Sequence, residues 1–176
     1  EEVLLLYRKK FLTKIVYFVD DCFTVDTEQA TNILSGINDR KLGCPLMIEA
    51  RVDQLLRDGM IECLSETDLT LIQIGVESGY NEGLKKIGKG ITTEEVVMCA
   101  QKLRQHRISH KAVMSFIIGL PWEDSGMAQK TLRFAADLTE RYGVQVNLAW
   151  WVPMPSRLWQ NRGNYGISLT DDIFDN

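Results

Sequence analysis

Short apolar runs alternate with longer amphipathic stretches along most of this chain, and this alternation constrains the fold more than any other feature of the sequence. Each run is four to eight residues long and is rich in β-branched and aromatic side chains. Such near-continuous apolar runs are typical of strands buried on both faces of a parallel sheet. The sequence predicts five of these strands, at residues 15–19, 45–48, 69–76, 111–118 and 144–151.

The stretches between the predicted strands carry apolar residues at helical spacing. Helices are expected at residues 27–42, 53–64, 93–105 and 125–141, and residues 1–12 resemble the end of another helix. Thr27 and Asp53 are the expected caps of the first two, and Thr92 with Glu95 forms a capping-box pattern before the third. Strands joined in this way favour right-handed crossovers and a parallel sheet, either open and doubly wound or a (β/α) barrel.

Length and composition suit one domain or a large part of one. The chain has 176 residues, of which 45% are hydrophobic and 25% charged, so a globular core is expected. Residues 1–152 are predicted to form the α/β unit, and residues 153–176, rich in Pro, Gly, Asn and Asp, a C-terminal loop or linker. Without an initiator Met, a signal peptide or an apolar run of membrane length, we expect a cytoplasmic fragment of a longer protein.

Several function classes find no support in the sequence. The net charge of −4 does not suggest bulk electrostatic binding of nucleic acid. His106 and His110 are four residues apart, but we expect the helix to end between them, so no metal pair is predicted. The four cysteines are widely spaced and are expected to be reduced thiols rather than metal ligands; they are Cys22, Cys44, Cys63 and Cys99.

Charged side chains follow successive predicted strands. Asp20 and Asp21 come after the first strand, Glu49 and Arg51 after the second, and Glu77 after the third. The carboxyl ends of parallel strands meet at one crevice, where binding sites form. Helix capping does not explain Glu49 and Glu77, because each directly continues an apolar strand. Carboxylates with one guanidinium suit a ligand that carries amine, carboxylate and hydroxyl groups.

Six short motifs at these strand ends, in this order, resemble the radical S-adenosylmethionine (SAM) superfamily. The motifs are VDDCF (19–23), EARVD (49–53), IGVESG (74–79), the segment from 84 to KGIT (89–92), SFIIGLPWE (115–123) and PMP (153–155). The resemblance covers roughly residues 11–155. It is to the branch that holds tRNA methylthiotransferases, coproporphyrinogen-dehydrogenase-like enzymes and cobalamin-dependent enzymes.

The resemblance implies a partial (β/α) TIM-like barrel in which the five predicted strands are the second to the sixth. In that family the first strand is followed by a C-x-x-x-C-x-x-C loop that binds a [4Fe–4S] cluster, and this sequence lacks the loop. We therefore expect the C-terminal part of the core domain, without cluster ligands and inactive by itself.

For the methionine part of the cofactor, the resemblance implies contacts from the first three predicted strands. Asp20 and Asp21 match a segment that contacts the amino group. Glu49 and Arg51 match positions near the methionine carboxylate and the ribose. Glu77 matches a contact with the ribose or the methionine.

For the adenosine part, the resemblance implies contacts from the last two predicted strands. Ser115, Ile117 and Gly119 match the segment that packs against adenine and the ribose. Ala149 and Trp150 lie where adenine-side contacts are expected. An ordinary polar residue in a strand is the alternative interpretation of Ser115.

Lys89 matches a basic residue that related enzymes place near the methionine carboxylate, and a solvated loop charge is the alternative. The resemblance identifies no catalytic residue. It implies cofactor-binding residues only, and no metal ligand within this sequence.

The function implied for the longer protein is that of a radical SAM enzyme. Such an enzyme binds SAM beside a [4Fe–4S] cluster and generates a 5′-deoxyadenosyl radical for hydrogen abstraction or group transfer. A cobalamin domain upstream is an expectation from the branch, and methyltransferases and tetrapyrrole cyclases are candidate reaction types. The expected partners are a small-molecule substrate and an electron donor. Two alternatives stay open: a tRNA-modifying methylthiotransferase-like enzyme, and a non-catalytic α/β ligand-binding module.

Overall fold

The computed structural model of this chain describes residues 15–20 and 22–170. Within them, parallel strands form one five-stranded sheet in the order β1-β2-β3-β4-β5. The strands are β1 (Val16–Tyr17), β2 (Leu46–Arg51), β3 (Leu69–Glu77), β4 (Ala112–Ile118) and β5 (Gln145–Trp150). A doubly wound sheet reverses its strand order, whereas a barrel does not. The sequential order therefore confirms the predicted partial (β/α) barrel.

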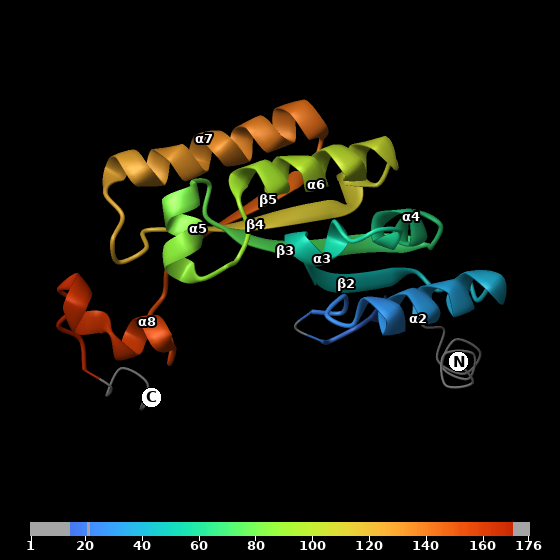
Figure 1. The fold of residues 1–176 in the computed structure, drawn as a ribbon, viewed down its shortest axis with the longest axis horizontal. Coiled ribbons are helices and arrows are strands. Elements are labelled where there is room, and N and C mark those ends of the chain that lie inside the picture. Colours follow the sequence, from blue (N-terminus) through green and yellow to red (C-terminus); the bar gives the residue numbers. More distant parts are fainter. Residues whose placement is uncertain (1–14, 21, 171–176) are drawn as a thin grey trace.

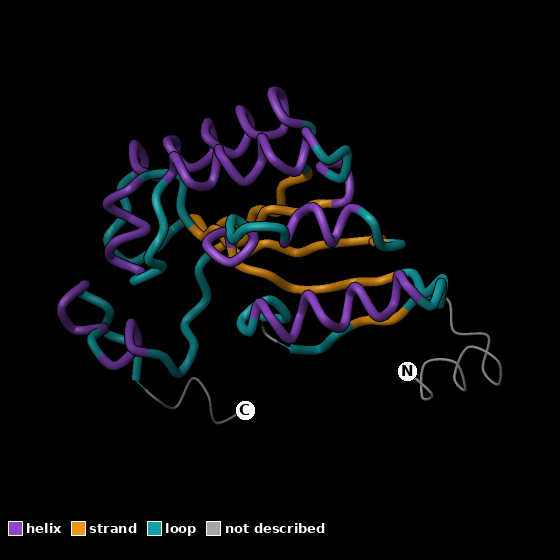
Figure 2. The backbone as a smooth tube through the Cα atoms, turned by 45° about the vertical axis from the view of Figure 1, so that its right-hand side comes forward, coloured by secondary structure: helices purple, strands orange, loops and turns teal. Residues whose placement is uncertain are grey.

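Helices connect each strand to the next. They are α2 (Thr27–Asp39), α3 (Val52–Leu55), α4 (Met60–Ser65), α5 (Asn81–Ile87), α6 (Thr93–Gln105), the 3₁₀ turn η1 (Ser109–Lys111) and α7 (Ser125–Tyr142). Figures 1 and 2 show the long helices α2, α6 and α7 running alongside the strands. After β5, the short helix α8 (Arg157–Gln160) and the 3₁₀ turn η2 (Arg162–Tyr165) extend away from the sheet (Figure 1).

The core lies between the helices and one face of the sheet. Residues of β2 and β4 are buried alternately, so that Ile48 and Met114 are buried while their neighbours in the strand are half-buried. Leu34 of α2 and Leu103 of α6 belong to the same apolar core. The expectation of strands buried on both faces is thus wrong for β2 and β4, because the opposite face carries polar side chains that remain accessible.

Two helix predictions need correction. Asp26, rather than Thr27, caps α2, since its carboxylate accepts a hydrogen bond from the backbone N–H of Gln29 at 3.0 Å. The single helix expected at 53–64 is instead α3 and α4, separated by a turn in which Gly59 has a left-handed φ of 80°. Asp53 lies within α3 and caps nothing.

The third helix agrees with its prediction. Thr92 and Glu95 form the complete capping box, and α6 covers the expected residues. Helix α5 was not predicted. The helix expected at residues 1–12 lies outside the described residues, and the boundary proposed at residue 152 stays a prediction. Among the helices of residues 15–20 and 22–170, none combines the length and the apolar character needed to cross a membrane.

Candidate functional site

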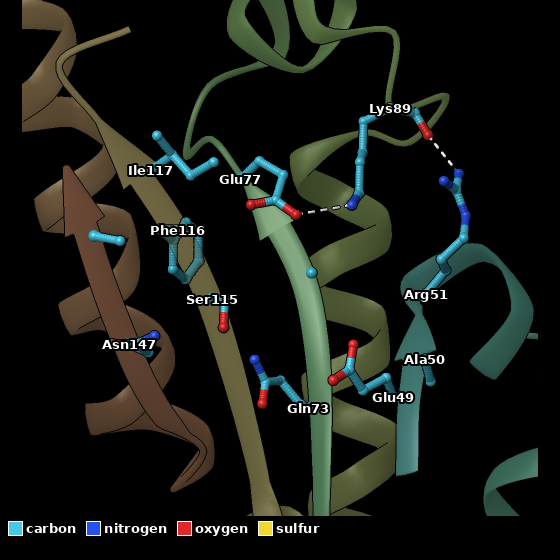
Figure 3. Close-up of a pocket in the computed structure, with 12 residues that line it drawn as sticks. Glu49, Ala50, Arg51, Gln73, Glu77, Lys89, Ser115, Phe116, Ile117 and Asn147 are labelled. Carbon is cyan, nitrogen blue, oxygen red and sulfur yellow. Dashed lines mark hydrogen bonds and ion pairs between the residues drawn. The ribbon is translucent and has the colours of Figure 1, made fainter. Parts of the chain in front are cut away.

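A cavity of about 320 Å³ lies on the face of the sheet opposite the helices, toward the carboxyl ends of the strands (Figure 3). This size falls within the range of small-molecule sites. Strands β2 to β5 and the loop after α5 line it, with Glu49, Ala50, Arg51, Gln73, Gly75, Glu77, Lys89, Ser115, Phe116, Ile117, Asn147 and Ala149. The position agrees with the general location of sites in parallel α/β folds.

Seven of the eleven residues singled out in the sequence line this cavity. They are Glu49, Arg51, Glu77, Lys89, Ser115, Ile117 and Ala149. Asp20 is exposed on a bend after β1 and does not line it, and neither do Gly119 and Trp150. Asp21 lies outside the described residues. The structure thus brings most of the candidate residues together, while their role in binding SAM remains a prediction.

Glu77 and Lys89 form an ion pair inside the cavity, with 3.0 Å between Lys89 Nζ and Glu77 Oε1. The two side chains are only 21% and 15% exposed, respectively. Glu77 has a left-handed φ of 78° and follows a register shift that begins at Gly75. Such irregularities turn a side chain in a new direction, and a non-glycine residue in this conformation costs about 1–3 kcal/mol. The ion pair therefore depends on a strained strand end.

Gly75 leaves the space that this ion pair occupies. A Cβ atom at position 75 would lie 2.6 Å from Glu77 Oε1 and 2.9 Å from Lys89 Nζ. Both distances are shorter than normal contacts, so a larger residue would push the paired groups aside. The lack of a side chain at Gly75 therefore allows the ion pair to form in this position.

Arg51 connects the end of β2 to the loop that carries Lys89. Its Nε donates to Asp53 Oδ1 at 2.9 Å, and its Nη2 donates to the backbone carbonyl of Lys89 at 2.7 Å. The guanidinium is planar and has five donors in a fixed arrangement. Arg51 therefore fixes the backbone from which Lys89 reaches Glu77.

Glu49 is the other carboxylate of the cavity and comes from the middle of β2. The hydroxyl of Tyr17 in β1 donates to Glu49 Oε1. In Figure 3 the carboxylate of Glu49 and the side-chain amide of Gln73 lie close to each other, and these residues are partners in the β2–β3 register. Helix capping cannot explain Glu49, as expected, because it points into the cavity.

The loop after β4 is held by a hydrogen-bond network beside the cavity. Glu123 Oε2 accepts from the backbone N–H groups of Gly119 at 2.8 Å and Leu120 at 3.1 Å, and Glu123 Oε1 accepts from the Tyr80 hydroxyl at 3.0 Å. The indole N–H of Trp122 donates to the same Tyr80 oxygen at 3.2 Å. Burial, followed by the hydrogen bond and the charge of Glu123, raises the pKa of Tyr80 to about 12.

Gly119 belongs to this network and lies, together with Trp150, outside the cavity lining. Gly119 has a left-handed φ of 76°, and a Cβ there would lie 3.1 Å from the Trp150 ring. The two residues pack against each other where β4 and β5 end. Glu123 bends the loop after β4 through a contact four residues along the chain, which strand periodicity does not predict.

Sequence reasoning missed the cavity residues Gln73, Gly75 and Asn147. The alternation of side chains along a strand could have found them, because positions 73, 75 and 77 of β3 lie on one face. Asn147 likewise shares a face with Ala149, which was expected at the adenine side.

Among the described residues, no group of three His, Cys, Asp or Glu side chains could hold a metal ion. His106 follows the last residue of α6 and pairs with Glu62 at 3.3 Å, whereas His110 lies in η1, so the two histidines do not share a helix. The four cysteines have free thiols, and burial raises the pKa of Cys99 to about 12.

The chain belongs to the radical SAM superfamily, whose family model matches residues 1–135. Uncharacterized methyltransferase PH0819 of Pyrococcus horikoshii is 30% identical over 163 residues, which cover 90% of this chain and 34% of that protein. Uncharacterized protein MJ1620 of Methanocaldococcus jannaschii is 27% identical over 136 residues, covering 76% of this chain and 26% of that protein. The chain thus spans about a third or less of these relatives.

Solved structures of the cobalamin-dependent S-adenosylmethionine radical enzyme OxsB have the same fold. The form with aqua-cobalamin and S-adenosylmethionine bound has a TM-score of 0.61 and 18% identity, over 93% of this chain and 25% of that one. The apo form has a TM-score of 0.61 and 22% identity, over 76% of this chain and 21% of that one. At these identities the likeness supports the fold, and it agrees with the partial barrel seen here.

Proposed function

We propose that this chain is the SAM-binding part of the catalytic domain of a cobalamin-dependent radical SAM enzyme that carries out group transfer. One observation carries the proposal: the Glu77–Lys89 ion pair lies inside a cavity at the carboxyl ends of the strands. The pair offers an anion and a cation side by side to a ligand that has both charges. Membership of the superfamily and the relative named as a methyltransferase support the choice of cofactor and of reaction type.

The residues of the cavity fit the chemical groups of SAM. Its ammonium and ribose hydroxyls suit the carboxylates of Glu77 and Glu49, and its carboxylate suits Lys89 and Arg51. The hydroxyl of Ser115 is buried without a hydrogen-bond partner among the described residues, which leaves a polar group for a ligand to satisfy.

Adenine would contact the apolar side chain of Ile117 and the loop after β4. The loop lies beside the cavity, where Gly119 and Trp150 pack together. Asp20, which follows β1 at the same end of the sheet, keeps its proposed contact with the amino group, and the contact proposed for Asp21 stays a prediction. In this arrangement the chain binds and orients the cofactor and excludes water from it.

Bound beside a reduced [4Fe–4S] cluster, SAM supplies a carbon radical for hydrogen abstraction or group transfer. The described residues do not fit the cluster itself, because they include no group of three suitable ligands. Its ligands, and those of cobalamin, must come from another segment of the longer protein. The part of this chain in the reaction is therefore to bind the cofactor and position it.

A non-catalytic α/β ligand-binding module is the second candidate. The finding that favours it is that the described residues include no group of three side chains suited to bind the cluster. The two candidates differ in the longer protein, where the enzyme must contain a cysteine triad and bind iron. A small-molecule substrate and an electron donor are the partners that the enzyme requires.

Isothermal titration calorimetry with S-adenosylhomocysteine tests the proposed site. This probe keeps the amine, carboxylate, ribose and adenine groups of SAM. We expect saturable binding at one site on the 176-residue chain. Absence of heat at millimolar probe, with the chain folded by circular dichroism, would contradict the proposed function.

A further inference from the structure

One polar side chain interrupts the buried face of helix α7. Thr131 is fully buried, and it shares this face with the apolar residues Ala135 and Leu138. A hydroxyl group in such a place is unfavourable unless it has a hydrogen-bond partner. The partner comes from outside the helix, because Thr131 Oγ1 accepts from the backbone N–H of Gly79 at 3.1 Å. Thr131 therefore connects α7 to the turn that follows β3.

Two other helical threonines use their hydroxyl groups within their own helix. Thr31 Oγ1 donates to the backbone carbonyl of Thr27 in α2 at 2.8 Å, and Thr139 Oγ1 donates to that of Ala135 in α7 at 3.4 Å. Neither of these contacts links a helix to another element. The contact of Thr131 does, since it holds a backbone group that lies 52 residues away in the chain.

The turn after β3 also packs directly against the backbone of α7. A Cβ atom at position 79 would lie 2.6 Å from Thr131 Cα and 2.9 Å from Phe134 Cβ, so only glycine allows this approach. The ring of Phe134 contacts the ring of Phe116 in β4 edge-on, with 6.2 Å between the two centroids. Helix α7 is thus anchored to the sheet one turn away from the residue that holds Gly79.

Glu77 lies two residues before Gly79 and depends on this turn. Its left-handed φ of 78° is a conformation that persists only where the surrounding contacts determine it. Figure 3 shows its carboxylate turned from the end of β3 toward Lys89. The ion pair acts on the side chain of Glu77, whereas the hydrogen bond of Thr131 acts on the backbone beside it. Without the backbone contact, Glu77 could return to an ordinary extended φ and turn its carboxylate away from Lys89.

We infer that Thr131 is a positioning residue for cofactor binding: its hydroxyl group holds the turn after β3 so that the carboxylate of Glu77 points into the cavity. The inference rests on the proposed function, because it takes Glu77 as a residue that binds the cofactor. Thr131 does not line the cavity. It therefore acts on the ligand only through Gly79 and Glu77.

Substitutions of Thr131 test this role. Thr131→Val keeps the shape of the side chain and removes the hydrogen-bond acceptor, whereas Thr131→Ser keeps the hydroxyl group. The affinity for S-adenosylhomocysteine is measured by calorimetry, and the ¹³C signal of the Glu77 carboxylate is followed by NMR and assigned with Glu77→Gln. We expect Thr131→Val to bind the probe about fivefold more weakly and to shift the Glu77 signal, and Thr131→Ser to restore both. Thr139→Val removes a hydroxyl group from the same helix and should change neither quantity.

A merely structural role gives a different result. Thr131→Val would then have a lower melting temperature, but the folded protein would keep the affinity and the Glu77 signal of the parent chain, and this outcome would overturn the inference. Equal losses of affinity in Thr131→Val and Thr131→Ser would overturn it as well, since the hydroxyl group would then have no part.

Hydrogen exchange in the parent chain provides a test without any substitution. The backbone amide of Gly79 should exchange more slowly when S-adenosylhomocysteine is bound, because the ligand and Thr131 fix the same turn. An exchange rate that does not change on binding would contradict the coupling between Thr131 and the cavity.

The same samples separate this inference from the proposed function. If S-adenosylhomocysteine binds and Thr131→Val behaves as the parent chain does, the role of Thr131 fails alone. If the probe does not bind the folded parent chain, the proposed function fails, and the role of Thr131 in cofactor binding fails with it.

Discussion

Lys89 Nζ lies 3.0 Å from Glu77 Oε1, although the two residues come from different elements, the end of β3 and the loop after α5. Removing one partner of such a half-buried pair leaves the charge of the other uncompensated, which is costly. The pairing therefore keeps each side chain in its position. A ligand with an ammonium and a carboxylate can replace both contacts without leaving either charge alone. This exchange is the basis of the proposed binding of the methionine part of SAM at the pair.

Gly75→Ala tests whether the space beside the pair matters. The new Cβ would contact Glu77 Oε1 and Lys89 Nζ, both at the ends of flexible side chains, so the side chains should move while the fold remains. We expect S-adenosylhomocysteine binding to weaken about tenfold, with a loss of unfolding free energy of about 1 kcal/mol or less. Calorimetry and urea unfolding measure the two effects.

Gly36→Ala in α2 is the control for that substitution. A Cβ at position 36 would have only Arg40 Nη1 nearby, at 3.8 Å. Alanine in a helix interior should raise the unfolding free energy by about 0.5–1 kcal/mol and leave ligand binding unchanged. Unaltered binding in Gly75→Ala would show that the pair can move without consequence, which contradicts its assigned role.

Tyr80 makes a contribution to the unfolding free energy that is lost at alkaline pH. Its pKa is raised from 10.0 to about 12 in the folded chain, mainly by burial, so the unfolded chain loses this proton first as pH rises. The contribution of Tyr80 is therefore complete below pH 10 and is lost as pH rises through about 12. Urea unfolding of the parent chain and of Tyr80→Phe at pH 8 and pH 11 isolates this contribution.

We expect the unfolding free energy of the parent chain to fall more steeply between these two pH values than that of Tyr80→Phe. Other groups that titrate in the same range, such as Cys99, are present in both proteins and cancel in the comparison. Parallel losses in the two proteins would mean that Tyr80 ionises equally in the folded and unfolded chains.

The 176-residue chain should not hold an iron–sulfur cluster. Its described residues contain no group of three metal-binding side chains, and the C-x-x-x-C-x-x-C motif is not in its sequence. After anaerobic incubation with iron and sulfide and then desalting, we expect a colourless protein without broad visible absorbance. A brown protein with about four irons per chain would show that the cysteines come together in a way that the structure does not contain.

The strands could be predicted from the sequence because apolar runs of this length have few alternative structures. Their order could not be obtained from these runs, which fit an open sheet and a barrel alike, and the barrel was implied by the family resemblance. The break between α3 and α4 could not be predicted either, since helical spacing continues through it, whereas α3 ends at Leu55 and α4 begins after the left-handed Gly59. The capping box of α6 was predictable because it depends on residues three apart.

Glu49 and Glu77 were recognisable as candidates because a carboxylate that continues an apolar strand is unfavourable unless it has a partner or a ligand. Gln73 and Asn147 carry no charge and gave no such signal, although they lie in the same cavity. The positions of Gly119 and Trp150 depend on the hydrogen bonds of Glu123 and on tertiary packing. Such contacts between separate segments cannot be obtained from local spacing.

Titration of Glu77→Gln with S-adenosylhomocysteine tests the central claim most directly, that Glu77 and Lys89 form the binding site for the cofactor. The substitution keeps the size of the side chain and removes its charge, so folding should survive while binding weakens at least about tenfold, as expected for a lost hydrogen bond to a charged group. Glu62→Gln, which changes an exposed carboxylate paired with His106, should bind as the parent chain does. Equal affinity of Glu77→Gln and the parent chain would contradict the claim.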